Sequence, residues 1–178
     1  MRAGRINHKK KELKFLGALL LVLLVFYLLI LTLRDWGFGL SYQESESMTP
    51  GWYMTYPIFS LNNLNHGDIV LFRPNPNIEN LMLSRGWILP DSPMMKYLRG
   101  LPGDFVCIQN NQLWINQVLI GPVAQKDSLG RDLPHWKFCQ VLKPGQYLMI
   151  STRSTHSFDG RYFGWINQDQ MIAKAIKI

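Results

Sequence analysis

Cysteine is scarce in this chain of 178 residues, which contains only Cys107 and Cys139. Neither has a neighbour typical of a metal site, and the four histidines show no ligand spacing such as H-E-x-x-H. The sequence therefore predicts no metal site and no cofactor. Whether the two cysteines form a disulfide or remain buried free thiols stays open, because their spacing alone fixes no geometry.

Basic charge is scarce outside one short block. The chain has 19 Lys and Arg against 12 Asp and Glu, a net charge of +7, and residues 1–14 hold six of the basic residues against Glu12 alone. This block carries +5, which leaves +2 for the rest of the chain. A nucleic-acid-binding protein would spread basic charge over its folded domain, so the pattern predicts no nucleic-acid partner.

Charge is absent from residues 15–33, which read FLGALLLVLLVFYLLILTL. At about 1.5 Å per residue a helix of this length spans roughly 28 Å, close to the hydrocarbon core of a bilayer. A cleaved signal peptide is the alternative, but its apolar region is usually about 7–15 residues long and ends at a small-residue cleavage site. The longer run, followed by RDWGF, favours a retained transmembrane helix over residues 15–33.

The basic block before this run predicts the topology of the chain. Positively charged flanks remain inside, so residues 1–14 are expected to form a cytoplasmic tail, and everything after residue 33 is expected outside. In a bacterium this places a single-pass protein in the inner membrane, with the lipid bilayer as partner. Residues 34–44 would be a linker and residues 45–178 a periplasmic domain, in an oxidising compartment that permits a disulfide.

Strong helical periodicity is missing after residue 33. Instead, short apolar runs alternate with turn residues, which predicts a mainly β domain. Residues 75–93 and 121–137 are rich in polar and turn residues, so we expect loops there. The expected strands lie around Lys96 and at residues 52–58, 69–72, 105–108, 113–115, 118–120, 146–150 and 172–178.

Lys96 lies inside the apolar run MMKYL, shortly before the turn residues Pro102-Gly103. Lysine is rarely buried because its charge is costly to desolvate. Burial lowers the pKa of a lysine, and the neutral amine can then serve as a general base. The alternative is a lysine whose stem covers apolar surface while its charge stays in water. For the buried case we expect Met149 and Ile150 to cover the amine.

A serine nucleophile would need such a base. The chain has no G-x-S-x-G elbow, and Ser92 stands one residue too far from Lys96 for an S-x-x-K motif. A Ser-His-Asp set can be drawn from His156 and Asp159, but no motif supports it. A Ser-Lys dyad, a known variant of the catalytic triad, remains.

Four motifs, in order along residues 45–164, carry a resemblance to the type I signal peptidases. They are S-E-S-M-T-P from Ser45, G-D-I-V-L-F from Gly67, K-Y-L-R-G-L-P-G-D from Lys96 and S-F-D-G-R-Y-F-G from Ser157. The resemblance implies a signal-peptidase-like antiparallel β domain behind a membrane anchor. It also implies that Ser47 is the nucleophile and Lys96 its neutral general base. The Ser47 N–H and the Ser45 hydroxyl would form the oxyanion hole.

The last motif implies three supporting roles. Ser157 would orient the Lys96 amine, and Asp159 would form an ion pair with Arg161, which can equally be an ordinary structural salt bridge. One departure concerns residues 151–153, Ser-Thr-Arg, where ordinary signal peptidases carry Gly-Asp-Asn. That turn must therefore be built differently.

The short chain and the last motif look more like the TraF-type peptidases of conjugative transfer, which process a pilin precursor and in some relatives join its ends into a ring. The leading hypothesis is therefore a membrane-anchored serine endopeptidase that processes an exported, membrane-embedded precursor. General removal of signal peptides is the first alternative. A non-catalytic anchored β scaffold of a secretion assembly is the second. A self-cleaving repressor is disfavoured, because the chain has a membrane run and no helix-turn-helix region.

Overall fold

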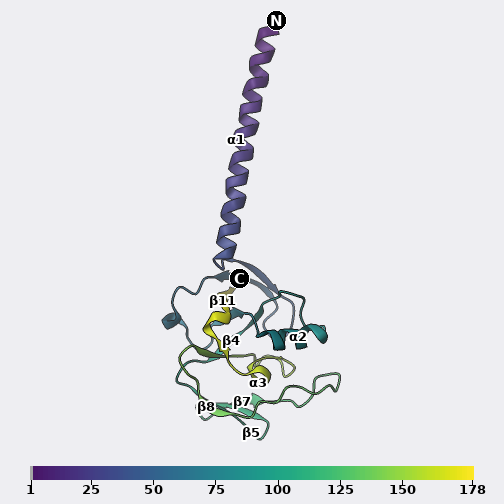
Figure 1. The fold of residues 1–178 in the computed structure, drawn as a ribbon, viewed down its shortest axis with the longest axis vertical. Coiled ribbons are helices and arrows are strands. Elements are labelled where there is room, and N and C mark those ends of the chain that lie inside the picture. Colours follow the sequence, from purple (N-terminus) through teal and green to yellow (C-terminus); the bar gives the residue numbers. More distant parts are fainter. Residues whose placement is uncertain (1) are drawn as a thin grey trace.

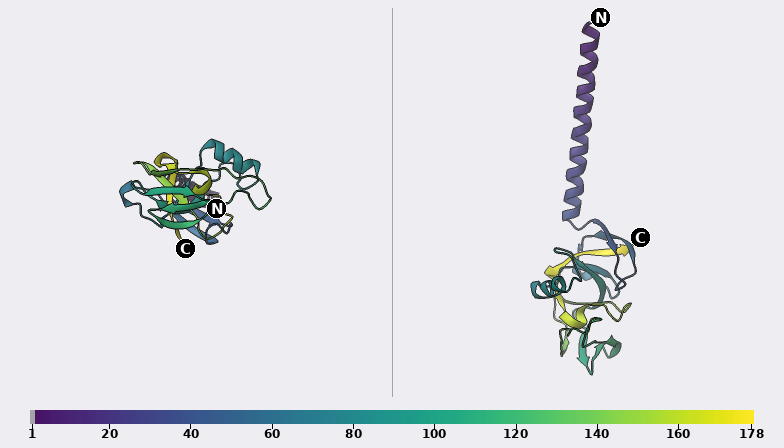
Figure 2. Two further views of the ribbon diagram at one scale, coloured as in Figure 1. Left: turned by 90° about the horizontal axis from the view of Figure 1, so that it is seen from below. Right: turned by 90° about the vertical axis from the view of Figure 1, so that its right-hand side faces the viewer.

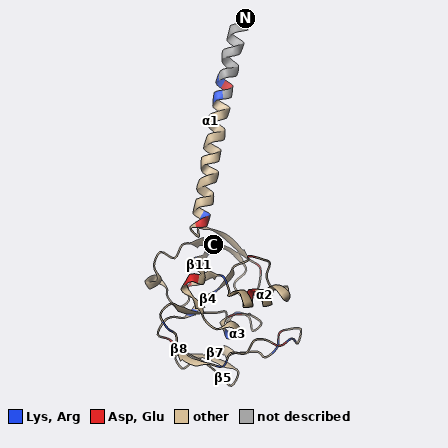
Figure 3. Cartoon of the chain, in the orientation of Figure 1, with Lys and Arg blue, Asp and Glu red and all other residues tan. Residues whose placement is uncertain are grey.

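The computed structural model describes residues 2–178, with the backbone alone for residues 2–10 and 13. Helix α1 (Arg2–Asp35) stands away from a β domain that holds the rest of the chain (Figures 1 and 2). Figure 3 shows no charged residue along α1 between Lys14 and Arg34. The stretch Lys14–Asp35 is long and apolar enough to cross a membrane, and the side chains of residues 15–30 are exposed.

Two antiparallel sheets make up the β domain. The larger has the order β1-β2-β11-β3-β4-β9-β10. Its strands are β1 (Gly39–Gln43), β2 (Gly51–Tyr56), β11 (Met171–Lys177), β3 (Ile69–Phe72), β4 (Met94–Gly100), β9 (Gln146–Ile150) and β10 (Ile166–Asn167). The smaller has the order β7-β6-β5-β8. Its strands are β7 (Val118–Pro122), β6 (Gln112–Ile115), β5 (Phe105–Gln109) and β8 (Cys139–Val141). The prediction of a mainly β chain with one apolar N-terminal helix is confirmed.

Short helical elements connect the strands. They are η1 (Leu61–Asn63), α2 (Pro76–Ser84), α3 (Gly160–Phe163) and η2 (Gln168–Gln170). Helix α2 corrects the expectation of a loop over residues 75–93. Asn75 caps it by accepting a hydrogen bond from the Ile78 N–H, and Pro76 occupies the first turn, where its missing N–H costs nothing.

Two further segments differ from expectation. Residues 34–44 contain β1, which pairs with β2 along its whole length, so this stretch is part of the sheet rather than only a linker. Residues 139–141 form β8, a strand too short to leave a pattern in the sequence. Both β1 and β8 lie at sheet edges, and each is recognised by its pairing with a neighbouring strand rather than by a sequence pattern.

Tight turns fix the register of the hairpins as the sequence predicts. Gly103 adopts φ +96°, and the Asp104 N–H donates to the Leu101 carbonyl at 3.0 Å across Pro102-Gly103. Asn110 and Asn111 both adopt positive φ between β5 and β6, as the two central residues of a type I′ hairpin turn do. These turns bring β4 into the large sheet and β5 into the small one.

Apolar side chains cover both faces of the central strands. Val70, Met94 and Leu98 belong to the main core, whereas Leu71 and Met95 belong to a second, smaller cluster on the other face. A strand buried on both faces reads as a continuous apolar run rather than as an alternation. This is why Ile-Val-Leu-Phe of β3 lacks the period of two.

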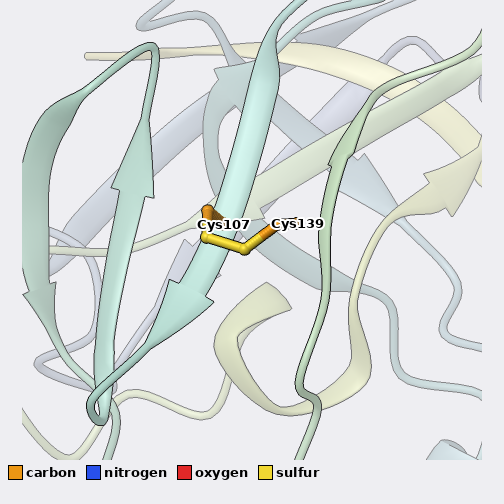
Figure 4. Close-up of a disulfide and its surroundings, with 2 residues drawn as sticks. All are labelled: Cys107 and Cys139. Carbon is orange, nitrogen blue, oxygen red and sulfur yellow. A yellow bond between two sulfur atoms is a disulfide. The ribbon is translucent and has the colours of Figure 1, made fainter.

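The two cysteines are joined in a disulfide, which resolves the alternative that the sequence left open. Cys107 on β5 and Cys139 on β8 are direct cross-strand partners (Figure 4). The bond therefore ties the edge strand of the small sheet to its neighbour.

Candidate active site

Two residues that are distant in the sequence meet beside the large sheet. Ser47 lies in the loop between β1 and β2, and Lys96 lies near the middle of β4. The Ser47 Oγ and Lys96 Nζ atoms are 2.7 Å apart, within hydrogen-bonding distance. The structure thus brings together the pair that the sequence suggests as nucleophile and base.

The sheet buries Lys96, whose exposed fraction is 6%. Its cross-strand neighbour is Val70 on β3, and two residues further along β4 Leu98 pairs with Met149 on β9. Side chains alternate along a strand, so Met149 lies on the face of Lys96, as expected. Ile150 pairs with Tyr97, the residue after Lys96, and belongs to the same core cluster as Met149, so its expected covering of the amine stays a prediction.

Burial has an electrostatic consequence for this amine. Desolvation lowers the pKa of Lys96 to about 8, since the charged form loses its hydration. The Asp159 carboxylate opposes this shift, and the Arg161 guanidinium supports it. The sequence showed no acid near Lys96 within β4. The acid that acts on it comes instead from a segment more than sixty residues later.

The Ser45 hydroxyl lies beside the nucleophile candidate, with its Oγ 2.9 Å from the Ser47 Oγ. Gln43, the last residue of β1, donates through Nε2 to the Ser45 Oγ at 2.5 Å and to the Ser45 carbonyl at 3.2 Å. These bonds hold the start of the loop in a fixed conformation. Gln43 could not be singled out from the sequence, because it lies in the segment expected to be a linker.

Ser151 is a second residue whose role was missed. It is fully buried, its hydroxyl donates to the Ser47 carbonyl, and its backbone N–H donates to Asp159 Oδ2 at 3.0 Å. Ser151 opens the stretch that departs from the Gly-Asp-Asn of ordinary signal peptidases. The different turn therefore links the nucleophile loop directly to the Asp159–Arg161 pair.

Asp159 and Arg161 form the expected ion pair, and it is almost completely buried. Arg161 Nε and Nη2 donate to the two carboxylate oxygens of Asp159, each at 2.9 Å. The remaining donors reach the carbonyls of Pro122, Ser151 and Ser157 at 3.0–3.2 Å. Burial alone would lower the pKa of Arg161, but the hydrogen bonds and charge of Asp159 outweigh it and raise that pKa.

This network has two consequences. A buried ion pair is tolerated only when its hydrogen-bonding groups are satisfied, and here Arg161 fastens both ends of the loop over residues 151–158. The Asp159 carboxylate accepts only from Ser151 and Arg161 within the described chain. It is therefore not available to orient His156, which argues against a Ser-His-Asp set.

Ser157 does not make its expected contact. Its side chain is 3% exposed and lines the same cleft as Lys96. Its Oγ has no hydrogen-bond partner among the residues that the structure describes, so a bond to the Lys96 amine is not formed. The orienting role of Ser157 remains a prediction.

A cleft of about 710 Å³ opens onto Ser47 and Lys96. Three segments line it besides the loop before β2: the stretch from α2 to β4, residues 124–133, and the loop over residues 154–158. Met82, Trp87, Ile88 and Met95 give much of the wall an apolar character. A cleft with an apolar wall and a few convergent polar groups is typical of an active or ligand-binding site.

The sequence assigns this chain to a known class of proteins. The sequence profile of the signal peptidases, peptidase S26, matches residues 14–178, and the chain belongs to this family. It is a serine peptidase family of the signal peptidase type.

Among individual relatives, the plasmid transfer protein TraF of Escherichia coli is 35% identical to this chain over 82 residues, 44% of this chain and 46% of TraF. A probable signal peptidase I-2 of Synechocystis is 23% identical over 118 residues, 66% of this chain and 49% of that protein. The chain thus matches about half the length of these curated relatives. A signal peptidase I from Enterococcus faecalis, solved by crystallography, is 21% identical, with a TM-score of 0.38 over 64% of this chain and 97% of that structure.

Proposed function

We propose that this protein is a membrane-anchored serine endopeptidase that cleaves exported precursor proteins, with Ser47 as nucleophile and Lys96 as general base. The observation that carries the proposal is the 2.7 Å contact between Ser47 Oγ and a buried Lys96 amine whose pKa is lowered to about 8. A hydroxyl attacks poorly at neutral pH unless an adjacent base takes its proton. An amine with a pKa near the working pH is suited to that task.

The reaction would proceed in two stages. Lys96 Nζ takes the proton from Ser47 Oγ as this oxygen attacks the scissile carbonyl carbon. The protonated amine then donates that proton to the leaving nitrogen, and the peptide bond breaks to give an acyl-enzyme on Ser47. In the second stage the neutral Lys96 amine takes a proton from water as the water oxygen attacks the ester carbon; the bond to Ser47 Oγ then breaks, Lys96 returns the proton to that oxygen, and the new carboxyl end is released.

Two donors are in position to stabilise the negative oxygen that forms in each stage. The Ser47 N–H donates to no acceptor within the described residues, and the Ser45 hydroxyl lies 2.9 Å from the Ser47 Oγ. Donors fixed before the reaction contribute most, because they need no reorganisation as charge develops. The bonds from Gln43 to Ser45 and from Ser151 to the Ser47 carbonyl supply that rigidity.

Helix α1 supports anchoring in a membrane, with residues 1–14 in the cytoplasm and the β domain in the periplasm. The basic block before an apolar span gives this orientation. β1 begins only a few residues after α1 ends, so the sheet that carries Ser47 would lie close to the bilayer surface. The enzyme would then cut membrane-embedded precursors near the point where they leave the lipid.

The substrate that we favour is a pilin precursor in conjugative transfer. The similarity to the plasmid transfer protein TraF supports this choice, whereas the similarity to a probable signal peptidase supports general removal of signal peptides as the second candidate. An acyl-enzyme can be attacked by water or by an amine. A site that excludes water and positions the substrate's own amino end would close a ring.

The deciding experiment is co-expression of the full chain with a candidate pilin precursor, followed by mass spectrometry of the product. Ser47→Ala and Lys96→Ala should each abolish processing, and the double variant should be no worse than either single one, because the two residues act as a unit. Lys96→Arg should also be inactive, since arginine stays protonated. Ser92→Ala, which changes another serine of the cleft, is the matched control and should process normally.

Two outcomes would redirect the proposal. Full activity of Ser47→Ala or Lys96→Ala would remove that residue from the mechanism and overturn the Ser-Lys dyad. A wild-type product lighter by one water than the linear cleaved chain would establish ring closure, whereas the linear mass would establish hydrolysis.

A further inference from the structure

Two segments far apart in the sequence form the side of the cleft that the peptidase motifs do not account for. One is α2 with the residues after it, including Trp87. The other is the hairpin loop of residues 125–133, closed by a bridge between Lys126 and Asp132. In Figure 1 this green loop extends from β7 toward the same side as α2. Trp87 and Asp127 both line the cleft.

Asp127 organises the hairpin from within. Its Oδ1 accepts from the backbone N–H groups of Leu129 and Arg131, each at 2.9 Å. Its Oδ2 accepts from Arg131 Nε at 2.6 Å. A short carboxylate that accepts from the backbone two and four residues later stabilises a tight turn.

The same carboxylate reaches across to α2. Arg85, the residue that ends α2, donates through Nη1 to Asp127 Oδ2 at 3.4 Å and through Nη2 to the Asp132 carbonyl at 2.6 Å. The side chains of Asp127 and Arg85 are only 6% and 14% exposed. An ion pair shielded from water to this degree is much less screened than one on the surface.

The two arginines that bind Asp127 also hold Trp87. The guanidinium carbons of Arg85 and Arg131 lie 5.0 and 5.7 Å from the indole centroid, a cation–π arrangement. Trp87 in turn packs against Phe158, at 5.0 Å between ring centroids. Phe158 stands between Ser157 and Asp159 in the sequence, so a chain of contacts runs from the hairpin to the loop beside Lys96.

We propose that Asp127 is a positioning residue that fastens the 125–133 hairpin to Arg85 and Trp87 and thereby sets the width of the substrate cleft. It determines which side chains of the substrate fit, and it takes no part in bond cleavage. This inference rests on the proposed peptidase function. An apolar pocket discriminates by size only if its wall cannot move, and the Asp127 carboxylate is what joins the two halves of this wall.

Asp127→Asn is a well-matched variant. The amide oxygen can still accept from Leu129 and Arg131 N–H, so the turn keeps its cap, but the negative charge that binds the two guanidinium groups is lost. Arg85→Gln removes the same contact from the other side, together with the bond to the Asp132 carbonyl, and leaves the Asp127–Arg131 turn intact. Asp132→Asn is the control, because that side chain is 84% exposed and meets only Lys126, at 3.8 Å.

The activity test uses the full chain in detergent micelles and a peptide library randomised around one bond, with mass spectrometry of the products. We expect wild type and Asp132→Asn to cleave the same narrow set of sequences. Asp127→Asn and Arg85→Gln should accept larger side chains, raise KM for the best peptide roughly tenfold and leave kcat within about twofold, as the loss of a shielded charged hydrogen bond implies. The double variant should differ little from the singles in substrate selection, because both substitutions break the Asp127–Arg85 contact.

Hydrogen exchange supplies a readout that does not depend on activity. The bonds from Asp127 N–H to the Arg131 carbonyl and from Leu133 N–H to the Gln125 carbonyl report on the hairpin. Asp127→Asn and Arg85→Gln should speed exchange in residues 125–133 roughly tenfold, with β9 and the Asp132→Asn control unchanged.

The outcomes separate the two proposals. Unchanged exchange, or faster exchange with unaltered substrate selection, overturns the role of Asp127. If wild type cleaves no peptide while exchange responds as expected, the attachment of the hairpin by Asp127 is supported and the proposed peptidase function is refuted.

Discussion

Lys96 is buried, and its proposed role as general base requires an uncharged amine. Its folded pKa of about 8 lies below the ordinary value of 10.5, mainly because of burial. The value of kcat/KM should therefore rise with pH, tenfold per unit below about pH 8, and level off above it. Initial rates on one peptide between pH 6 and 10 would measure this. A rate that falls with pH over that range would contradict a neutral Lys96 as base.

The same burial bears on stability. The unfolded lysine keeps its proton up to about pH 10.5 and the folded one loses it near pH 8, so between these values the unfolded state binds more protons. Wild-type stability should therefore rise with pH in that window, and below pH 8 the protein carries the full penalty of about 3 kcal/mol.

Lys96→Met removes the buried amine but keeps a stem of similar length. The variant should be inactive, yet at pH 7 it should be as stable as wild type or more stable by up to about 3 kcal/mol, with the advantage shrinking toward pH 10. Thermal melting of the full chain in detergent at pH 7 and pH 10 would test this. A large loss of stability in Lys96→Met would mean that Lys96 is a charged structural partner.

The site residues differ in how far sequence alone reveals them. Ser47 and Lys96 stand in motifs whose resemblance to a family gives their roles, and the structure brings them together. Ser151 could not be found in this way, because it acts through a hydrogen bond to Ser47, which only folding brings near, and Gln43 was missed because it lies outside the four motifs. The effect of Asp159 on the Lys96 pKa was missed because Asp159 caps α3, and only the fold brings that residue near β4.

At the scale of elements, the disulfide between β5 and β8 makes the clearest prediction. It closes a loop of 32 residues, for which the loss of chain entropy in the unfolded state gives about 3–4 kcal/mol. Reducing agent should lower Tm by roughly 10 °C in wild type. The double variant Cys107→Ser and Cys139→Ser should melt at the lower temperature with or without reductant.

Neither cysteine lines the cleft, so peptide cleavage at moderate temperature should be the same for the double variant and wild type. A Tm that does not respond to reductant would show that the bond contributes nothing to stability.

The elements also show where sequence reasoning succeeds. Strands such as β3 and β9 are runs of apolar residues between turn signals, and such runs predict strands even without an alternating pattern. Helix α2 was missed although Asn75-Pro76 is a typical helix start, because its nine residues are too few to show clear periodicity and polar neighbours suggest a loop. β1 was missed because an edge strand is defined by its partner.

For the whole molecule, the basic block and α1 predict a cytoplasmic N-terminus and a periplasmic β domain. A reporter that is active only in the periplasm should work when fused after residue 178. The same reporter fused after residue 14 should be inactive, and a reporter active only in the cytoplasm should show the reverse pattern. Activity of the cytoplasmic reporter after residue 178 would invert this topology.

The order of strands in the large sheet determines when, during synthesis, the two halves of the candidate site can come together. β11 comes later in the chain than every other strand of its sheet, yet it lies between β2, which follows the Ser47 loop, and β3, which pairs with the Lys96 strand. At a synthesis rate of about 5–20 residues per second, β11 follows β4 by roughly 4–14 s. Until then no strand of this sheet joins β2 to β3, so we expect the Ser47 loop and the Lys96 strand to come together only after β11 has been made.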